Sequence, residues 1–150
     1  MIKSKKRLNK RTILKKTEGE WTQKERHYLE KKQTEKCDEI FSLYIRYRDR
    51  KCVLCGSVEN LQCSHYFTKK SHAAVRWYEV NAHAMCDKCH CRHHNQGEHE
   101  YSMWILDKYG RGMIDLLEQK AYSEKSYTLQ ELCDIENMYK AEVRIMEGIQ

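Results

Sequence analysis

The sequence predicts a mainly helical α+β protein, in which a small strand–strand–helix unit lies between a long N-terminal helix and C-terminal helices. Two pairs of cysteines with C-x2-C spacing bracket a short segment that carries several histidines. No glycine or proline occurs between Glu20 and Arg50, which indicates a long helix before the first pair. A capping-box pattern and helical apolar spacing return near the end of the chain.

Length and composition are those of one small domain with extensions. The chain has 150 residues, of which 40% are hydrophobic and 33% are charged. No apolar run approaches the ~20 residues that a membrane span needs. The first residues lack the apolar core of a secretory signal, so we expect a cytoplasmic protein whose cysteines stay reduced.

The two cysteine pairs predict one structural zinc site, because each pair can wrap two thiolates around a tetrahedral ion. The expected ligands are Cys52, Cys55, Cys86 and Cys89. Gly56, directly after the first pair, lets the backbone turn so that its amides point at the thiolates. The alternative for these four residues is a set of redox thiols. The other cysteines lie outside this spacing and are expected to be ordinary thiols.

Positive charge is concentrated in the N-terminal part of the chain. Residues 1–36 hold 13 Lys/Arg against 5 Asp/Glu, whereas residues 37–150 hold 15 against 17. Residues 1–16 are expected to form a flexible basic arm, which suits a DNA phosphate backbone because neutralised phosphates release counterions. A solvated tail is the alternative. The expected DNA-binding residues are Lys5, Lys6, Arg7, Lys10, Arg11, Lys15 and Lys16.

Residues 17–50 are expected to form the long helix. Thr17 and Glu20 have the spacing of a capping box, in which a hydroxyl and a carboxylate satisfy the first free amides. Apolar residues then recur at helical spacing on one stripe, which fits either an intramolecular core or a dimer seam. The stripe consists of Cys37, Ile40, Phe41, Tyr44 and Tyr47. Arg48 falls on the same face, so its charge must reach solvent or an acidic partner.

Residues 51–97 are expected to form the zinc-bound unit. Residues 61–66 alternate well enough for a strand, and residues 75–80 are rich in β-branched and aromatic side chains. The two segments would pair as a hairpin with a long connection. The second cysteine pair would then open a helix near Cys89.

Residues 98–150 are expected to form packing helices. One helix should end at Gly110 in a left-handed cap, and a short helix should follow up to Ala121. Thr128 and Glu131 form a second capping-box pattern before a final amphipathic helix. The Met and aromatic residues of this region fit a core, so no chemistry is assigned to it.

His65, Asn81 and His90 are the candidates for catalysis of phosphodiester hydrolysis. In a one-metal nuclease, a histidine takes a proton from water while a divalent cation stabilises the developing charge. His65 near a strand end and His90 at a helix start would face one phosphate if zinc joins the two elements. Asn81 would hold the intervening loop by hydrogen bonds to the backbone. The alternatives are a packing histidine and an ordinary turn asparagine.

Several segments carry a resemblance to a known family. They are Ile45-Arg46-Tyr47-Arg48-Asp49-Arg50, the two cysteine pairs, Ser64-His65-Tyr66, Val75-Arg76-Trp77 and Asn81-Ala82-His83. From about Cys37 to Ile145 the sequence resembles the phage lambda NinG (Rap) recombination proteins, within the HNH or His-Me finger (ββα-metal) nucleases. The resemblance implies a ββα-metal core and an endonuclease that cuts Holliday junctions or other branched DNA in the phage-infected bacterial cell. It also implies that His65 is the general base and that His90 binds the catalytic cation.

The sequence departs from this pattern at one metal ligand. Many relatives have an acidic residue beside or just before the catalytic histidine, whereas residues 62–64 here are Gln, Cys and Ser. His93 and His94 lie about one helical turn beyond His90 and could complete the coordination, with His90 and His94 as the expected pair. His83 also matches the family pattern, without an assigned role.

The leading expectation is a metal-dependent, structure-selective DNA endonuclease with structural zinc and catalytic Mg²⁺ or Mn²⁺. Its partner would be branched DNA, and symmetric cutting of a junction makes a homodimer attractive. Two alternatives stay open. One is a zinc-knuckle DNA-binding module without cleavage activity, and the other is a sequence-specific HNH endonuclease.

Overall fold

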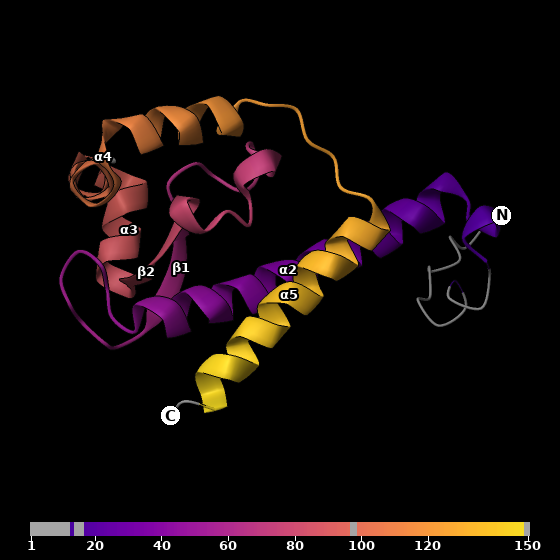
Figure 1. Ribbon diagram of the computed structural model, residues 1–150, viewed down its shortest axis with the longest axis horizontal. Helices are drawn as coiled ribbons and strands as arrows, with labels where there is room; N and C mark the ends of the chain where they lie inside the picture. Colours follow the sequence, from indigo (N-terminus) through magenta and orange to yellow (C-terminus); the bar gives the residue numbers. More distant parts are fainter. Residues whose placement is uncertain (1–12, 14–16, 97–98, 149–150) are drawn as a thin grey trace, which may run out of the picture.

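The computed structural model describes residues 13, 17–96 and 99–148. Within them, helices surround a two-stranded sheet (Figure 1), which confirms the mainly helical α+β class. The elements in chain order are η1 (Glu18–Glu20), α2 (Gln23–Asp49), β1 (Leu61–His65), η2 (Ala73–Val75), η3 (Glu79–Asn81), β2 (Ala82–Cys86), α3 (Asp87–Gln96), α4 (His99–Ala121) and α5 (Leu129–Gly148).

The long helix α2 begins later than predicted. The Thr17 amide does donate to Glu20 Oε2 over 2.6 Å, but this pair closes only the single turn η1. A second T-x-x-E pattern starts α2, where the Thr22 hydroxyl accepts from the Glu25 amide and the Glu25 carboxylate accepts from the Thr22 amide. Thr22 has an extended backbone, which separates the two boxes. The long helix was therefore predicted correctly, and its first residue was wrong.

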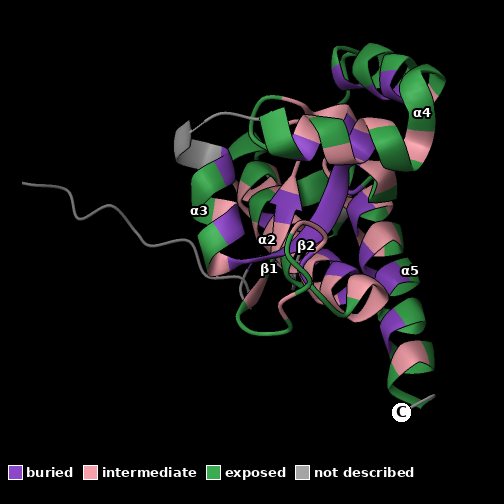
Figure 2. Cartoon of the chain, turned by 90° about the vertical axis from the view of Figure 1, so that its left-hand side faces the viewer, coloured by how far each residue is buried: buried purple, intermediate pink, exposed green. Residues whose placement is uncertain are grey.

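The sheet is one antiparallel pair, in which His65 lies opposite Ala82 and Leu61 lies opposite Cys86. The predicted first strand is confirmed to within one residue. β2 is buried along its whole length between the helices (Figure 2). A strand that is buried on both faces has no polar–apolar alternation, so no periodic pattern indicated β2.

The second strand predicted at residues 75–80 is wrong. The backbone amides there bond locally, with Tyr78 N donating to Val75 O and Asn81 N donating to Tyr78 O, so the segment folds into the turns η2 and η3. Val75 and Trp77 are buried. Their apolar character therefore reflects burial in the core and not a strand.

The outer edge of β2 is closed by the end of α2 and by the loop after it. Arg48 Nη2 donates to the carbonyl of Ala82 over 2.8 Å. The amide of Ala84 donates to Asp49 Oδ2 over 2.7 Å, and the amide of Val53 donates to Ala84 O over 3.0 Å. Arg48 Nε also lies 2.7 Å from Asp49 Oδ1, which is the acidic partner that its position required.

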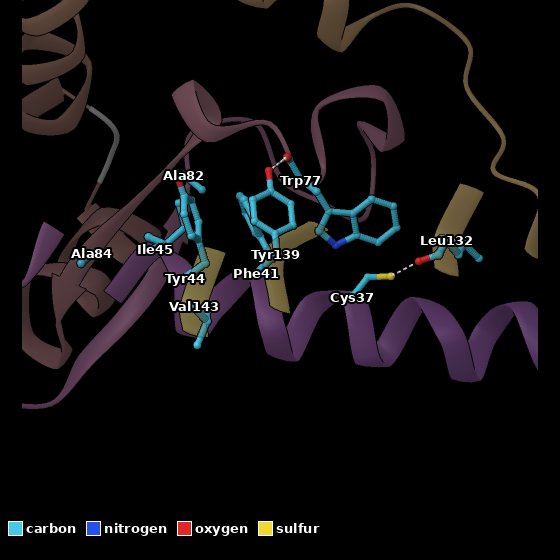
Figure 3. Packing of buried hydrophobic residues seen from close by; sticks show 10 residues of the cluster. All are labelled: Cys37, Phe41, Tyr44, Ile45, Trp77, Ala82, Ala84, Leu132, Tyr139 and Val143. Atoms are coloured by element: carbon cyan, nitrogen blue, oxygen red, sulfur yellow. Dashed lines mark hydrogen bonds between the residues drawn. The ribbon is translucent and has the colours of Figure 1, made fainter. Parts of the chain in front are cut away.

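α2 and α5 pack along their apolar stripes (Figures 1 and 3). Phe41 and Tyr44 of α2 each have their ring centroid 4.9 Å from that of Tyr139 in α5. The Cys37 thiol donates to the carbonyl of Leu132 over 3.0 Å. The predicted stripe is thus an intramolecular core, and α5 covers the face that a dimer seam would need.

The C-terminal helices follow the predicted breaks. Gly110 has a φ of 75° and interrupts α4, which lets the two parts of α4 run in different directions. The Thr128 hydroxyl and the Glu131 carboxylate form the second capping box at the start of α5. None of the helices that the structure describes combines the length and the apolar character of a membrane-spanning segment. The basic residues predicted to bind DNA, from Lys5 to Lys16, lie outside the described residues.

Candidate metal centre and histidine cavity

The four cysteines predicted to bind zinc come together. Their sulfur atoms all lie within 4.8 Å of one another, and Cys55 Sγ is 3.6 Å from Cys86 Sγ. A zinc ion with Zn–S bonds of about 2.3 Å places its four sulfurs about 3.8 Å apart. All eight cysteines are free thiols, so no disulfide competes for these sulfurs. The group can therefore hold a structural metal ion such as zinc.

Short-range backbone hydrogen bonds build the first half of this centre. The Gly56 amide donates to Cys52 O over 2.9 Å, and the Cys52 amide donates to Ser57 O over 2.7 Å. Gly56 has a φ of 77°, which favours glycine. The resulting tight turn places both cysteines of the first pair on one side, while the second pair lies where β2 continues into α3.

Amide groups point at the buried sulfur of Cys52. Burial by itself would raise the pKa of this thiol, but hydrogen bonds from the backbone amides of Cys86, Cys55 and Leu54 lower it to about 7. A thiolate is the form that binds zinc, so these amides favour metal binding. Three of the four cysteines are buried and only Cys55 is exposed, which suits a closed structural site.

His65 and His90 line one cavity of about 310 Å³, at the place where β1, α2 and α3 meet. The same cavity is lined by Asp38, Phe41, Ser42, Cys63, Thr68, Lys69 and Lys70. Burial raises the pKa of the Cys63 thiol to about 12, so Cys63 stays protonated and is no nucleophile. Most of the lining side chains are polar or charged.

The ring of His65 has a defined hydrogen-bond arrangement. Its Nε2 lies 2.9 Å from the carbonyl oxygen of Arg76. Because a carbonyl oxygen only accepts, Nε2 carries the proton of the neutral ring and Nδ1 keeps its lone pair. Burial lowers the pKa of His65 to about 4, so the ring is neutral at pH 7. A neutral ring with a free Nδ1 can accept a proton.

Asn81 is fully buried and hydrogen-bonds to the loop that follows β1. Its Oδ1 accepts from the Phe67 amide over 2.7 Å, and its Nδ2 donates to Phe67 O and to Val75 O, each over 2.9 Å. These are the backbone hydrogen bonds that the sequence led us to expect for Asn81. The amide side chain thus ties the start and the middle of the loop between His65 and β2 to the end of the loop, where Asn81 stands.

A family model described as the bacteriophage lambda NinG protein matches residues 2–148. The chain belongs to the NinG family. NinG proteins are phage recombination proteins, and the match covers nearly the whole chain. No curated protein and no solved structure shows significant similarity to it.

The α3 histidines of this NinG-family chain differ in their surroundings. His90 faces the cavity of His65, whereas His93 is buried, with its ring against Tyr101 and its Nε2 3.4 Å from the carbonyl oxygen of His65. His93 is therefore not a surface histidine. The side chain of His94, predicted to bind the catalytic cation, is outside the described side chains. Within the described residues, the cysteine group is the one set of three or more ligands close enough to share an ion.

His83, which had no assigned role, packs on the opposite face of the sheet. Its Nδ1 and Nε2 each lie 2.8 Å from a tyrosine hydroxyl, those of Tyr101 and Tyr109 respectively. Trp104 packs against the ring with a centroid distance of 4.7 Å. Burial lowers the pKa of His83 to about 3, which keeps it neutral. These contacts make His83 part of the packing between β2 and α4.

Asp38 of α2 is the cavity residue that sequence reasoning missed in this NinG-family chain. Its carboxylate accepts from Arg76 Nε and Nη2 over 2.9 and 2.7 Å, from Lys69 Nζ over 2.9 Å and from Trp77 Nε1 over 3.0 Å. Burial would raise the pKa of Asp38, but the hydrogen bonds from Arg76 and Lys69 hold it below its usual value. The one sequence signal was a carboxylate beside the apolar stripe. Its partners follow 31 to 39 residues later, beyond the reach of local patterns.

Proposed function

We propose that this NinG-family chain is an HNH-type, metal-dependent endonuclease that hydrolyses branched DNA during phage recombination. The observation that supports it best is the state of His65. Its Nε2–H is held by a carbonyl, so its Nδ1 keeps the lone pair that can accept a proton. The cavity that His65 lines also holds His90 and two lysines.

Element order supports a ββα-metal, or His-Me finger, core. His65 is the last residue of β1, and β2 leads through the second cysteine pair into α3. His90 lies in the first turns of α3, so zinc would fix the strand and helix that carry the two histidines.

In the proposed reaction, His65 Nδ1 takes a proton from a water molecule whose oxygen attacks the phosphorus, while the bond to the leaving oxygen breaks. Lys70 is exposed at the cavity and would contact the phosphate. A bound Mg²⁺ or Mn²⁺ would stabilise the charge on the phosphate and the leaving oxygen, with His90 and His94 as its proposed protein ligands. The zinc held by the cysteines would be structural.

Cleavage assays of the zinc-loaded protein test this proposal. With Mg²⁺ or Mn²⁺, the native protein should cut four-way junctions or flaps in preference to linear duplex. His65→Ala should lose at least about 100-fold of the rate, because it removes the general base. His27→Ala, an exposed histidine of α2, is the matched control and should cut normally. No cleavage of branched, flapped or linear DNA by the native protein would refute the enzyme.

One observation favours the alternative, a zinc-knuckle DNA-binding module without cleavage. The described side chains offer no second group of three ligands for a catalytic cation. Tight junction binding that is the same for the native protein and His65→Ala, with no product, would support the module. Cleavage of linear duplex at one sequence would instead support a sequence-specific endonuclease.

The N-terminal basic residues are proposed to bind the DNA backbone. Replacing the seven lysines and arginines between Lys5 and Lys16 by Gln leaves the buried Ile13 in place. Each lost phosphate contact should reduce the slope of log affinity against log salt by about 0.9 for duplex. Binding measured between low and physiological salt checks this, and an unchanged slope would indicate a solvated tail.

A further inference from the structure

We propose that Asp38 is a positioning residue, which fixes the peptide carbonyl that holds His65 in its proton-accepting tautomer. The catalytic consequence rests on the proposed function, whereas the effect on the His65 ring does not. In this proposal the Asp38 carboxylate does not bind a metal ion. It acts on His65, the proposed general base, through the backbone of the loop after β1.

The carbonyl in question belongs to the peptide unit that joins Arg76 to Trp77. It accepts from His65 Nε2 over 2.9 Å. The side chains of both residues of this peptide donate to Asp38, Arg76 through Nε and Nη2 and Trp77 through Nε1. One carboxylate on α2 therefore restrains the peptide from both of its ends.

Other hydrogen bonds restrain the Arg76 amide and the Trp77 carbonyl, which lie on either side of the Arg76 carbonyl, but not the Arg76 carbonyl itself. The Arg76 amide donates to Ala73 O over 3.1 Å, and the Tyr139 hydroxyl donates to Trp77 O over 2.7 Å. A peptide between two fixed neighbours can still rotate about its flanking φ and ψ angles. The side-chain hydrogen bonds to Asp38 oppose that rotation.

Low exposure makes the Asp38–Arg76 pair an effective restraint. The two side chains are 18% and 22% exposed, and the guanidinium binds the carboxylate through two nitrogens. Such a fork combines charge with fixed geometry. Lys69 is the weaker partner, since its side chain is 46% exposed and contributes a single donor. The same four hydrogen bonds occupy the carboxylate, which leaves it unsuited to binding a cation.

The carbonyl matters because a neutral imidazole has two tautomers. A fixed acceptor beside Nε2 favours the Nε2–H form, whose Nδ1 is the proton acceptor. If the carbonyl turns away, the Nδ1–H form becomes populated, and that form cannot accept a proton at Nδ1. Loss of Asp38 should thus lower the fraction of His65 in the competent form.

NMR of the histidine ring nitrogens in the zinc-loaded full chain tests this directly. The His65 signals are assigned by their loss in His65→Ala. In the native protein they should report the Nε2–H tautomer. In Asp38→Asn, which keeps an oxygen for Trp77 but lacks the charge, the ratio of the two tautomers should change about tenfold or more toward Nδ1–H, as expected for loss of a charged hydrogen bond. Arg76→Lys keeps the charge without the fork and should shift the ratio in the same direction.

Two variants serve as controls. Lys69→Gln removes the weaker partner, and Asp134→Asn removes an exposed carboxylate of α5; both should keep the native tautomer. Circular dichroism and zinc content show whether each variant is folded. If Asp38→Asn does not fold, the tautomer ratio of His65 in Arg76→Lys tests the proposal in its place. A folded variant that keeps the native tautomer overturns the proposal.

Cleavage kinetics separate this inference from the proposed endonuclease. Should the native protein cut DNA, Asp38→Asn is expected to lower kcat in proportion to the fraction of His65 that the NMR signals show to have lost the Nε2–H form. KM should change little, because DNA contacts are unaffected. Should the native protein cut nothing, the endonuclease proposal fails, and the NMR result alone still confirms or overturns the role of Asp38.

Discussion

The cysteine centre and the His65 cavity are neighbours built by different means. The cysteine centre is formed by two short pairs, each held by its own turn or helix start, so its residues can be recognised from spacing alone. The cavity is formed by residues from α2, β1, the loop after β1 and α3, which meet only in the folded chain. Chemistry encoded by local spacing is visible in a sequence, whereas a partner that joins the site only in the folded chain, such as Asp38, is not.

Removal of zinc should produce the largest effect. It tests whether the cysteine centre stabilises the structure around the His65 cavity. Cys86→Ser should abolish stoichiometric zinc and unfold the region around the sheet, because a structural zinc of this type contributes about 10 kcal/mol. Metal analysis and thermal unfolding measure both effects. Cys91→Ser, an exposed cysteine outside the group, is the control and should keep one zinc per chain. A Cys86→Ser protein with native stability would contradict the role of the centre.

Asn81→Ala tests the loop that completes the cavity. The change leaves three backbone groups without their partner, two of partly buried Phe67 and one of buried Val75. We expect a loss of about 3 kcal/mol in the free energy of unfolding. Urea unfolding measures it, with Gln130→Ala on the exposed face of α5 as the control. A loss below about 1 kcal/mol would show that the loop is fixed by other contacts.

Acid should weaken the protein through two histidines, His65 and His83, whose pKa values are lowered in the folded chain. The pKa of His65 is lowered to about 4 and that of His83 to about 3, from an ordinary value of 6.5. The unfolded chain thus binds more protons below pH 6.5, so stability is lost as the pH falls from there. At pH 5 each histidine should cost about 2 kcal/mol.

The variant His83→Gln isolates one of these contributions. It should reduce the difference in unfolding free energy between pH 7.5 and pH 5 by about 2 kcal/mol. The zinc content is measured at both pH values, so that loss of metal can be excluded as the cause of the change in stability. An unchanged difference would mean that His83 titrates normally in the folded protein.

Residue spacing predicted the elements whose signals are local. The α2 stripe, the second capping box, the break at Gly110 and the cysteine group were all found from patterns within a few residues. The start of α2 was missed because two T-x-x-E patterns stand in tandem, and only the backbone of Thr22 decides between them.

The remaining features depend on contacts that spacing does not contain. Residues 75–80 have strand-like composition, yet their amides bond locally and β2 follows them. Asp38 was missed because its partners lie on a loop far along the chain. His93 is buried under Tyr101 of another helix, which no α3 pattern indicates. Each case is decided by tertiary packing over local preference.

The closed outer edge of β2 also bears on how copies of the chain can meet. A strand with free amides and carbonyls is a template for a strand from another molecule. Here Arg48, Asp49 and Val53 already occupy the outward-facing groups of Ala82 and Ala84. Sheet extension from this side, and the aggregation that can follow from it, is therefore blocked by the protein's own side chains and by the backbone of the loop after α2.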